Sequence, residues 1–189
     1  MANLKSLAAL AAALLLISML SSCLPIPLGD PEKSQTDAKL SGYWHLKQDS
    51  GGVLITIAPA DSHVYVIDYL EYKKAGDDLT AAHRYVLRGW LTELKGQRFL
   101  TTEMIAQLLD KPENKDYVIF KVAIENDQVT ATPLADKYDA FKDLKDPAAL
   151  AQAIEQHLDD PKMYDDPSVF TRLDPGKEQD KTLIDLFAK

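Results

Sequence analysis

Cysteine is nearly absent from this chain: of its 189 residues, only Cys23 is a cysteine. A disulfide within the chain is therefore excluded, and a folded domain must take its stability from the packing of its core. If the chain is exported, a single cysteine also needs an explanation of its own, because secreted proteins usually carry cysteines in pairs.

Motifs for metal binding and nucleophilic catalysis are lacking as well. The histidines are scattered, and none belongs to an H-E-x-x-H pair or lies near the cysteine: His45, His63, His83 and His157. Three acidic doublets lack the spacing and the glycine of an EF-hand loop, and capping or solubility accounts for them: Asp77-Asp78, Asp159-Asp160 and Asp165-Asp166. The chain has no G-x-S-x-G elbow. The sequence therefore predicts no cofactor, no metal ligand and no catalytic residue.

Basic charge is scarce relative to acidic charge. The chain has 21 Lys and Arg residues against 29 Asp and Glu residues, which gives a net charge of −8 at pH 7. An acidic domain has no electrostatic reason to bind nucleic acid, and anionic lipid headgroups repel it. A solvated acidic surface that favours solubility is the plainer interpretation.

The longest apolar run lies at the N-terminus, where Leu7 to Leu20 follow Lys5, the only charged residue of that region. A positive start, a short apolar stretch and small residues before a cut are typical of an export signal. The run is too short to predict a membrane-spanning helix. We therefore expect residues 1–22 to be a signal peptide.

The residues Leu20-Ser-Ser-Cys23 resemble the lipobox of bacterial lipoproteins, which has an aliphatic residue, two small residues and then a cysteine. The resemblance implies cleavage after Ser22 by signal peptidase II, a diacylglyceryl thioether on Cys23 and an acylated N-terminus, so the membrane becomes a partner through this lipid. Two or more acyl chains form a stable anchor. The alternative is an ordinary secretory signal that ends by chance in a cysteine.

Residues 23–32 also resemble the start of a group of proteobacterial lipoproteins, a resemblance that brings no activity with it. In Gram-negative lipoproteins an Asp after the lipidated Cys tends to retain the protein at the inner membrane. Leu24 occupies that place here, which implies the outer membrane, periplasmic side. For a source that is not Gram-negative, only anchoring to the cell membrane is implied.

The mature chain is expected to begin with a tether over residues 23–39, where Pro25, Pro27 and Pro31 disfavour regular structure. At full stretch it would hold the rest roughly 30–40 Å from the bilayer. Residues 40–189 are expected to form a single globular domain, β-rich over 40–132 and mainly helical over 133–189.

Seven segments of the β-rich part carry strand patterns, with β-branched and aromatic residues between turn-forming separators: 43–47, 53–58, 64–72, 85–94, 98–102, 117–124 and 129–132. Such a series predicts an antiparallel meander, either a curved sheet or a partial barrel. Helical spacing follows over 134–144, 147–158 and 178–188, with 168–173 ambiguous between strand and turn. The predicted fold class is α+β, with about seven strands followed by two or three C-terminal helices.

The first strand opens with Gly42-Tyr-Trp44, which resembles the Gly-x-Trp start of lipocalin-like barrels, where the Trp packs across the closed end. That resemblance implies a cup for a small apolar ligand. The other interpretation, an aromatic side chain that fills the core of a sheet, is the one that the sequence by itself favours. Other lipocalin signatures are not recognisable.

Four tyrosines of the predicted strands could form an exposed docking patch or pack inside a two-sided sheet. They are Tyr65 and Tyr69 on the face opposite Val64 and Val66, Tyr72 at the end of that strand, and Tyr117 on the face opposite Phe120. Taken together, the sequence favours a non-catalytic, lipid-anchored envelope protein that binds an envelope protein or a small apolar ligand. The alternatives are an anchored hydrolase and a structural accessory subunit of an envelope assembly.

Overall fold

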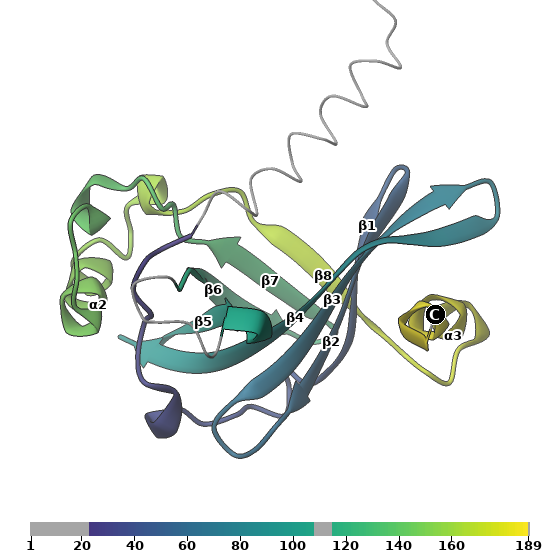
Figure 1. Ribbon diagram of the computed structural model, residues 1–189, viewed down its shortest axis with the longest axis horizontal. Coiled ribbons are helices and arrows are strands. Elements are labelled where there is room, and N and C mark those ends of the chain that lie inside the picture. The colour runs from purple at the N-terminus through teal and green to yellow at the C-terminus, as the bar shows by residue number, and fades with distance from the viewer. Residues whose placement is uncertain (1–22, 108–114, 189) are drawn as a thin grey trace, which may run out of the picture.

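The chain folds into a closed antiparallel β-barrel, seen in a computed structural model that describes residues 23–107 and 115–188 (Figure 1). Each strand pairs with its neighbour in sequence, and the last pairs with the first. The strands are β1 (Gly42–Gln48), β2 (Gly51–Pro59), β3 (Tyr65–Ala75), β4 (Asp78–Leu94), β5 (Gln97–Met104), β6 (Tyr117–Glu125), β7 (Gln128–Pro133) and β8 (Ser168–Leu173).

The strand β8 closes the barrel. It pairs with β1, with Trp44 opposite Arg172, and on its other side with β7, with Val129 opposite Phe170. Each of the seven predicted strand segments lies in an observed strand to within one residue, but the predicted open sheet or partial barrel of about seven strands is corrected to a closed barrel of eight. Closure leaves neither β1 nor β7 as an unpaired edge. The fold is thus a β-barrel with few helices, and not a sheet followed by a helical third.

Alternation along each strand divides its side chains between the lumen and the outer wall. In β6, Phe120, Val122 and Ile124 join the apolar cluster inside the barrel, whereas Ile119 joins a cluster outside it. The division of this strand into two faces was predicted from its period of two. The lumen and the outer wall of the barrel therefore both carry apolar side chains, and the outer ones need a cover.

The helix α2 (Pro147–Gln156) covers one side of the outer wall. The Asp146 carboxylate caps it by accepting a hydrogen bond from the Ala148 N–H at 2.8 Å, and Pro147 occupies the first turn, as the sequence predicted. Leu150 and Ile154 of this helix are buried against the barrel. Because α2 precedes β8 in the chain, the predicted order of strands first and helices last is wrong.

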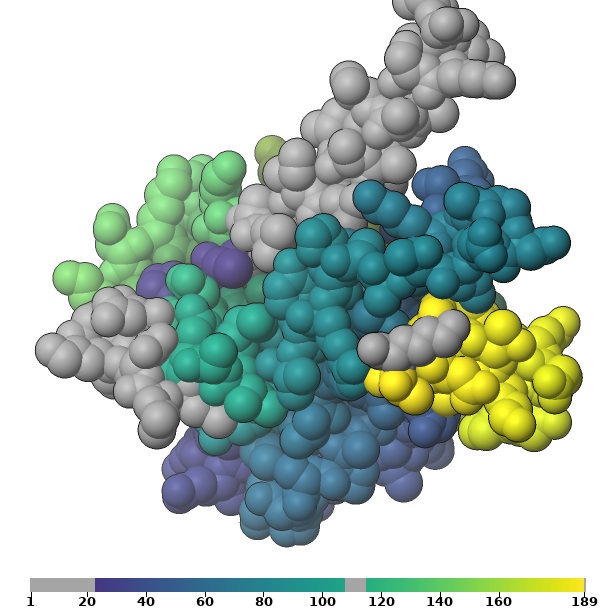
Figure 2. Space-filling model, turned by 45° about the vertical axis from the view of Figure 1, so that its right-hand side comes forward, coloured from purple at the N-terminus to yellow at the C-terminus, as the bar shows by residue number. Residues whose placement is uncertain are grey.

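The C-terminal helix lies on the other side of the barrel, as Figures 1 and 2 show. It consists of α3 (Glu178–Ile184) and a final 3-10 turn, and Leu186 packs on Leu54 and Leu70. The helix predicted over 134–144 is reduced to one short turn. The short 3-10 turns are η1 (Pro31–Lys33), η2 (Ile105–Gln107), η4 (Asp139–Phe141), η5 (Pro161–Met163) and η6 (Asp185–Ala188).

The segment Leu24–Lys39, predicted to be an extended tether, instead lies along the outer wall of the barrel. Leu28 is fully buried, and its carbonyl accepts hydrogen bonds from Trp90 Nε1 at 2.8 Å and from Thr101 Oγ1 at 3.0 Å. Gly29 has a φ of +75°, and a Cβ there would lie 2.1 Å from Thr92 Oγ1, so only glycine lets the segment approach this closely. Apart from the bridge at Leu24 and the short turn η1, which begins at Pro31, the segment has no helix or strand, and its prolines do not keep it away from the barrel.

The four tyrosines considered for a docking patch are not exposed together. Tyr65 is fully buried, and Tyr69 lines the lumen. Tyr72 is buried with the C-terminal helix, and Tyr117 is buried where its strand pairs with Leu24. The second of the two predicted interpretations, tyrosines packed within a two-sided wall, is therefore the correct one.

Candidate ligand site in the barrel lumen

The barrel encloses an apolar cavity of about 80 Å³. Its walls are almost entirely aliphatic and aromatic, and they are formed by Leu40, Trp44, Ile55, Ile57, Ile67, Tyr69, Leu87, Leu100, Thr102, Phe120, Val122, Val129, Ala131 and Phe170. The Thr102 hydroxyl donates a hydrogen bond to the Val118 carbonyl at 3.1 Å, so it is satisfied within the wall. The cavity thus offers dispersion contacts and little else.

One end of the cavity is closed by Trp44, which is 1% exposed. Its Nε1 donates a hydrogen bond to the Leu40 carbonyl at 2.8 Å, and the Arg172 guanidinium stacks 4.0 Å from its ring centroid. Arg172 also donates to the carbonyl of Ser41 at 2.7 Å. A Cβ at Gly42 would lie 2.5 Å from Arg172 Nη1, which explains why a glycine precedes this tryptophan by two residues.

The residues just before β1 complete this closed end. Arg98 Nη1 forms an ion pair with the Asp37 carboxylate, and the Tyr65 hydroxyl donates to the Asp37 carbonyl at 3.2 Å. Burial raises the pKa of the Tyr65 hydroxyl, which keeps it protonated as a donor. Asp37 therefore ties the end of the outer segment to both β3 and β5 beneath the cavity.

A small polar group stands at the other end of the lumen. The Tyr69 hydroxyl donates a hydrogen bond to Glu71 Oε1 at 2.9 Å. The Tyr85 ring lies 6.0 Å from the Tyr69 ring, and the His83 ring stacks on Tyr85 at 6.5 Å. Burial, and after it the charge of Glu71, raises the pKa of Tyr69, so this hydroxyl remains a donor at every physiological pH. The lumen therefore has an apolar body and a hydrogen-bonding rim.

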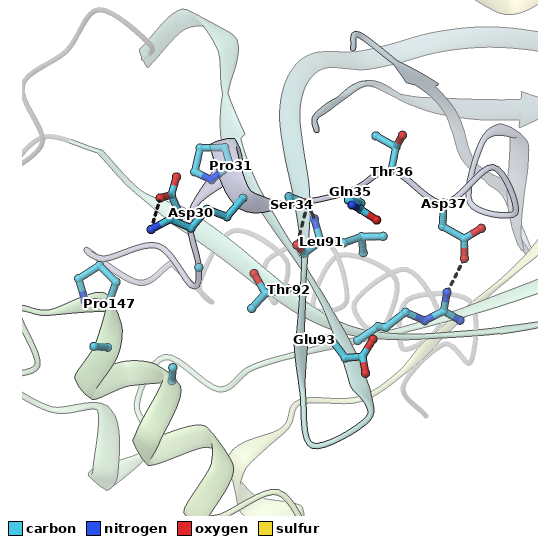
Figure 3. A pocket seen from close by; sticks show the side chains of 15 residues that line it. Asp30, Pro31, Ser34, Gln35, Thr36, Asp37, Leu91, Thr92, Glu93 and Pro147 are labelled. Atoms are coloured by element: carbon cyan, nitrogen blue, oxygen red, sulfur yellow. Dashed lines mark hydrogen bonds and ion pairs between the residues drawn. The ribbon is translucent and has the colours of Figure 1, made fainter. Parts of the chain in front are cut away.

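A second, larger hollow lies on the surface between the outer segment, the β4–β5 hairpin and the start of α2, with a volume of about 1020 Å³ (Figure 3). Several of its polar side chains already have partners. Lys33 pairs with Asp30 at 3.1 Å, and the Ser34 hydroxyl donates to the Leu91 carbonyl at 2.7 Å. This hollow is an open groove where the segment crosses the barrel, and its polar groups serve to hold that segment.

Cys23, the predicted lipidation site, is the first residue that the structure describes. It is half-buried, and Leu24 beside it pairs with Tyr117. Burial and the charges of Asp116 and Asp136 raise the pKa of the Cys23 thiol. A raised pKa keeps this thiol protonated at neutral pH.

The four histidines are held apart in the fold. His45 Nε2 lies 2.9 Å from the Tyr72 hydroxyl, His63 Nδ1 lies 2.7 Å from the Ser34 carbonyl, and the His157 ring meets Tyr138 edge to face. His45 and His83 lie on β1 and β4, which are not neighbouring strands. Within residues 23–107 and 115–188, no three His, Cys, Asp or Glu side chains are grouped for a metal.

The pKa of His45 predicts a pH dependence of stability. Burial first, and Lys47 second, lower this pKa against the opposing effect of Asp180. Between the unfolded value of about 6.5 and the lower folded value, the unfolded chain binds more protons. The stabilisation that comes from keeping His45 neutral is therefore fully present above about pH 6.5. It is lost as the pH falls through the pKa that His45 has in the folded protein.

The measurement is urea unfolding at about pH 8 and about pH 5, with His45→Gln as the variant. We expect the variant to lose less stability on acidification than the parent chain, because glutamine keeps a polar contact for Tyr72 and does not titrate. An equal loss in both proteins would show that His45 does not contribute.

The acidic doublet Asp159-Asp160 has a capping role, as predicted. The Asp160 carboxylate accepts from the Lys162 N–H at 2.9 Å and from the Tyr138 hydroxyl at 2.7 Å. These two hydrogen bonds lower its pKa. A carboxylate engaged in this way stabilises the η5 turn.

The sequence did not predict that Arg172 stacks on Trp44, nor that Tyr69, Glu71 and Tyr85 form a polar group at the rim of the lumen. The signal for Arg172 was the alternation of β8, which places Phe170 and Arg172 on one face of a segment that was left undecided. The signal for the rim was the common parity of Tyr69, Glu71 and their partner Tyr85. Both depend on knowing which strands are neighbours, and the closure of the barrel decides this.

The fold and its lumen together define a class: a closed, up-and-down barrel of eight antiparallel strands with a lipocalin-like shape. Comparison with known protein families, with curated proteins and with solved structures finds no match to this chain. In the described part of the chain, none of the helices has the length and apolarity that crossing a bilayer requires.

Proposed function

We propose that this protein is a lipid-anchored, non-catalytic binding protein of the cell envelope, whose barrel takes a slender apolar ligand. The apolar lumen carries this proposal. With Leu24 after the lipidated Cys23, the proposed location is the outer membrane, periplasmic side. The lipobox resemblance supports the anchor, and the lumen supports the binding role.

The size of the lumen limits the ligand. Its volume of about 80 Å³ is far below the roughly 300–1,000 Å³ of sites for drug-sized molecules. It corresponds to a few water-sized spheres at about 10–15 Å³ each, so only a short, slender apolar segment of a ligand fits. Leaving such an apolar space empty costs about 2 kcal/mol, at roughly 24 cal/mol per Å³. A ligand would recover this free energy.

The polar side chains at the rim of the lumen favour a ligand that has a polar group at one end. Tyr69 and Glu71 supply a hydroxyl and a carboxylate beside the apolar body of the lumen. A molecule with an apolar tail and a hydrogen-bonding head meets both requirements at once. We therefore propose an amphiphile with a single slender tail as the ligand class.

Native mass spectrometry of the chain from Leu24 onward, purified from periplasm without its lipid, tests this function. We expect a reproducible bound mass of roughly a few hundred daltons. Ala131→Phe, which fills the lumen, should weaken binding about tenfold or more, a factor worth roughly 1.4 kcal/mol.

The matched control is Ala123→Phe, the same change at an exposed position of the barrel wall. It should keep the bound mass. A clean apo monomer in the parent chain would contradict the proposal and favour a protein partner, to be sought by crosslinking in intact envelopes. Retention of the ligand by Ala131→Phe would place the binding site outside the lumen.

A further inference from the structure

Cys23, the proposed site of the lipid anchor, is held close to the barrel wall by the backbone pairing of its neighbour Leu24. The Leu24 N–H donates to the Tyr117 carbonyl at 2.8 Å, and the Tyr117 N–H donates to the Leu24 carbonyl at 2.9 Å. Leu24 is 3% exposed. Cys23 is therefore one residue away from a position fixed on the barrel wall, and a lipid on it cannot swing freely around the domain.

The fixed position lies at the end of the barrel that carries the half-buried Tyr69 and Tyr85, opposite Trp44, which we call the open end. Tyr117 is the first residue of β6, at the end that β6 shares with the β1–β2 and β3–β4 turns. The segment from Leu24 then runs the length of the barrel to Asp37 and Leu40 at the closed end (Figure 1). The anchor and the Trp44 plug are thus at opposite ends.

We infer that the protein stands with the open end of its barrel against the bilayer, and that the lumen takes the terminal carbons of one acyl chain of a membrane lipid directly from it. This inference rests on the proposed anchor at Cys23 and names the source and class of the proposed ligand. An acyl chain that enters from the bilayer never exposes its methylenes to water, so the transfer avoids the cost of hydrating them.

The groups at the open end suit this orientation. Tyr69 and Tyr85 stand at the rim of the lumen, and tyrosines prefer the headgroup level because one end of the side chain is apolar and the other polar. In the two hairpins at this end, lysines and aspartates balance one another: Lys47, Lys73 and Lys74 against Asp49, Asp77 and Asp78. These two hairpins therefore carry no excess of acidic charge that an anionic surface would repel.

Photo-crosslinking of the full, acylated protein in vesicles of phosphatidylethanolamine and phosphatidylglycerol tests the orientation. The photoreactive residue p-benzoylphenylalanine replaces Ser50 in the β1–β2 turn or, as the matched control, Ser62 in the β2–β3 turn. Both serines are exposed and lie at opposite ends of the barrel. We expect several-fold more lipid adducts from position 50. Equal labelling, or more labelling from position 62, would overturn the orientation.

Fluorescence quenching tests the entry of the acyl chain. The chain has two tryptophans, and Trp90→Phe leaves only Trp44, at the closed end of the lumen and far from the anchor. In vesicles of lipids with brominated acyl chains, Trp44 should be quenched several-fold, and adding Ala131→Phe should abolish the quenching while Ala123→Phe keeps it. Unquenched Trp44 in the folded protein would overturn the entry of an acyl chain.

The two experiments separate this inference from the proposed function. A bound mass in native mass spectrometry together with equal crosslinking at both ends would overturn the orientation and leave the binding role intact. Adducts from position 50 without any bound mass or quenching would support the orientation and overturn the binding role. Far-ultraviolet circular dichroism of each variant confirms that the barrel has formed.

Discussion

Replacing Cys23 by serine is expected to release essentially all of the protein from membrane fractions and to abolish incorporation of labelled palmitate. Serine cannot form the thioether, so both acyl chains are lost together, and two chains are what makes an anchor of this kind stable. Without residues 1–22, and so without Lys5, the chain has 20 basic and 29 acidic residues, a net charge of −9, and has no attraction for anionic lipid of its own. Fractionation and metabolic labelling measure the two effects.

The control for this experiment is Ser22→Ala, which keeps a small residue before the cysteine and should leave fractionation and labelling unchanged. Persistent membrane attachment of Cys23→Ser would contradict the lipobox assignment. It would favour the alternative of an ordinary secretory signal, with a protein partner holding the domain at the membrane.

Replacing Trp44 by alanine is expected to lower the free energy of unfolding by about 3–5 kcal/mol, the range for removing a large buried aromatic side chain. The ring is almost fully buried, and it is the surface on which Arg172 stacks. Its removal also leaves the Leu40 carbonyl without the Nε1–H donor. Urea denaturation followed by circular dichroism measures the change.

Two further variants calibrate this prediction. Trp44→Phe keeps an aromatic surface and loses the Nε1–H, so it should cost less than the alanine variant. Val169→Ala removes methyl groups from a side chain that is 44% exposed, and it should change stability by less than about 0.5 kcal/mol. An alanine variant at position 44 as stable as the parent chain would refute the role of Trp44 as the plug of the barrel.

Much of the barrel wall could be predicted from local patterns. A run such as Tyr117–Glu125 alternates with a period of two, which identifies both the strand and its two faces without any neighbour. Asp146-Pro147 likewise identifies the start of α2, because an N-cap and a first-turn proline act within a few residues. Gly42 and Trp44 marked the first strand, and the structure adds that Gly42 leaves room for Arg172.

Other parts of the candidate site depended on contacts between residues distant in sequence. Arg172 meets Trp44 only because β8 returns to β1, and the short segment 168–173 carries no local signal strong enough to predict that pairing. The segment from Leu24 to Lys39 was expected to stand away from the domain because of its prolines. Its prolines limit it to a single bridge at Leu24 and one short turn, but the apolar side chain of Leu28 determines that it is buried.

By itself, the sequence determined the strand segments, their alternation, the capped helix and the resemblance on which the proposed anchor rests, because each depends on residues close together in the chain. Only the tertiary structure decided that the sheet closes, that the outer apolar rows are covered by the helices and the N-terminal segment, and that the anchor and the plug lie at opposite ends of one lumen. Closure depends on how all eight strands are shifted relative to one another. That shift is set by contacts between distant residues, and the local periodicity of one strand does not reveal it.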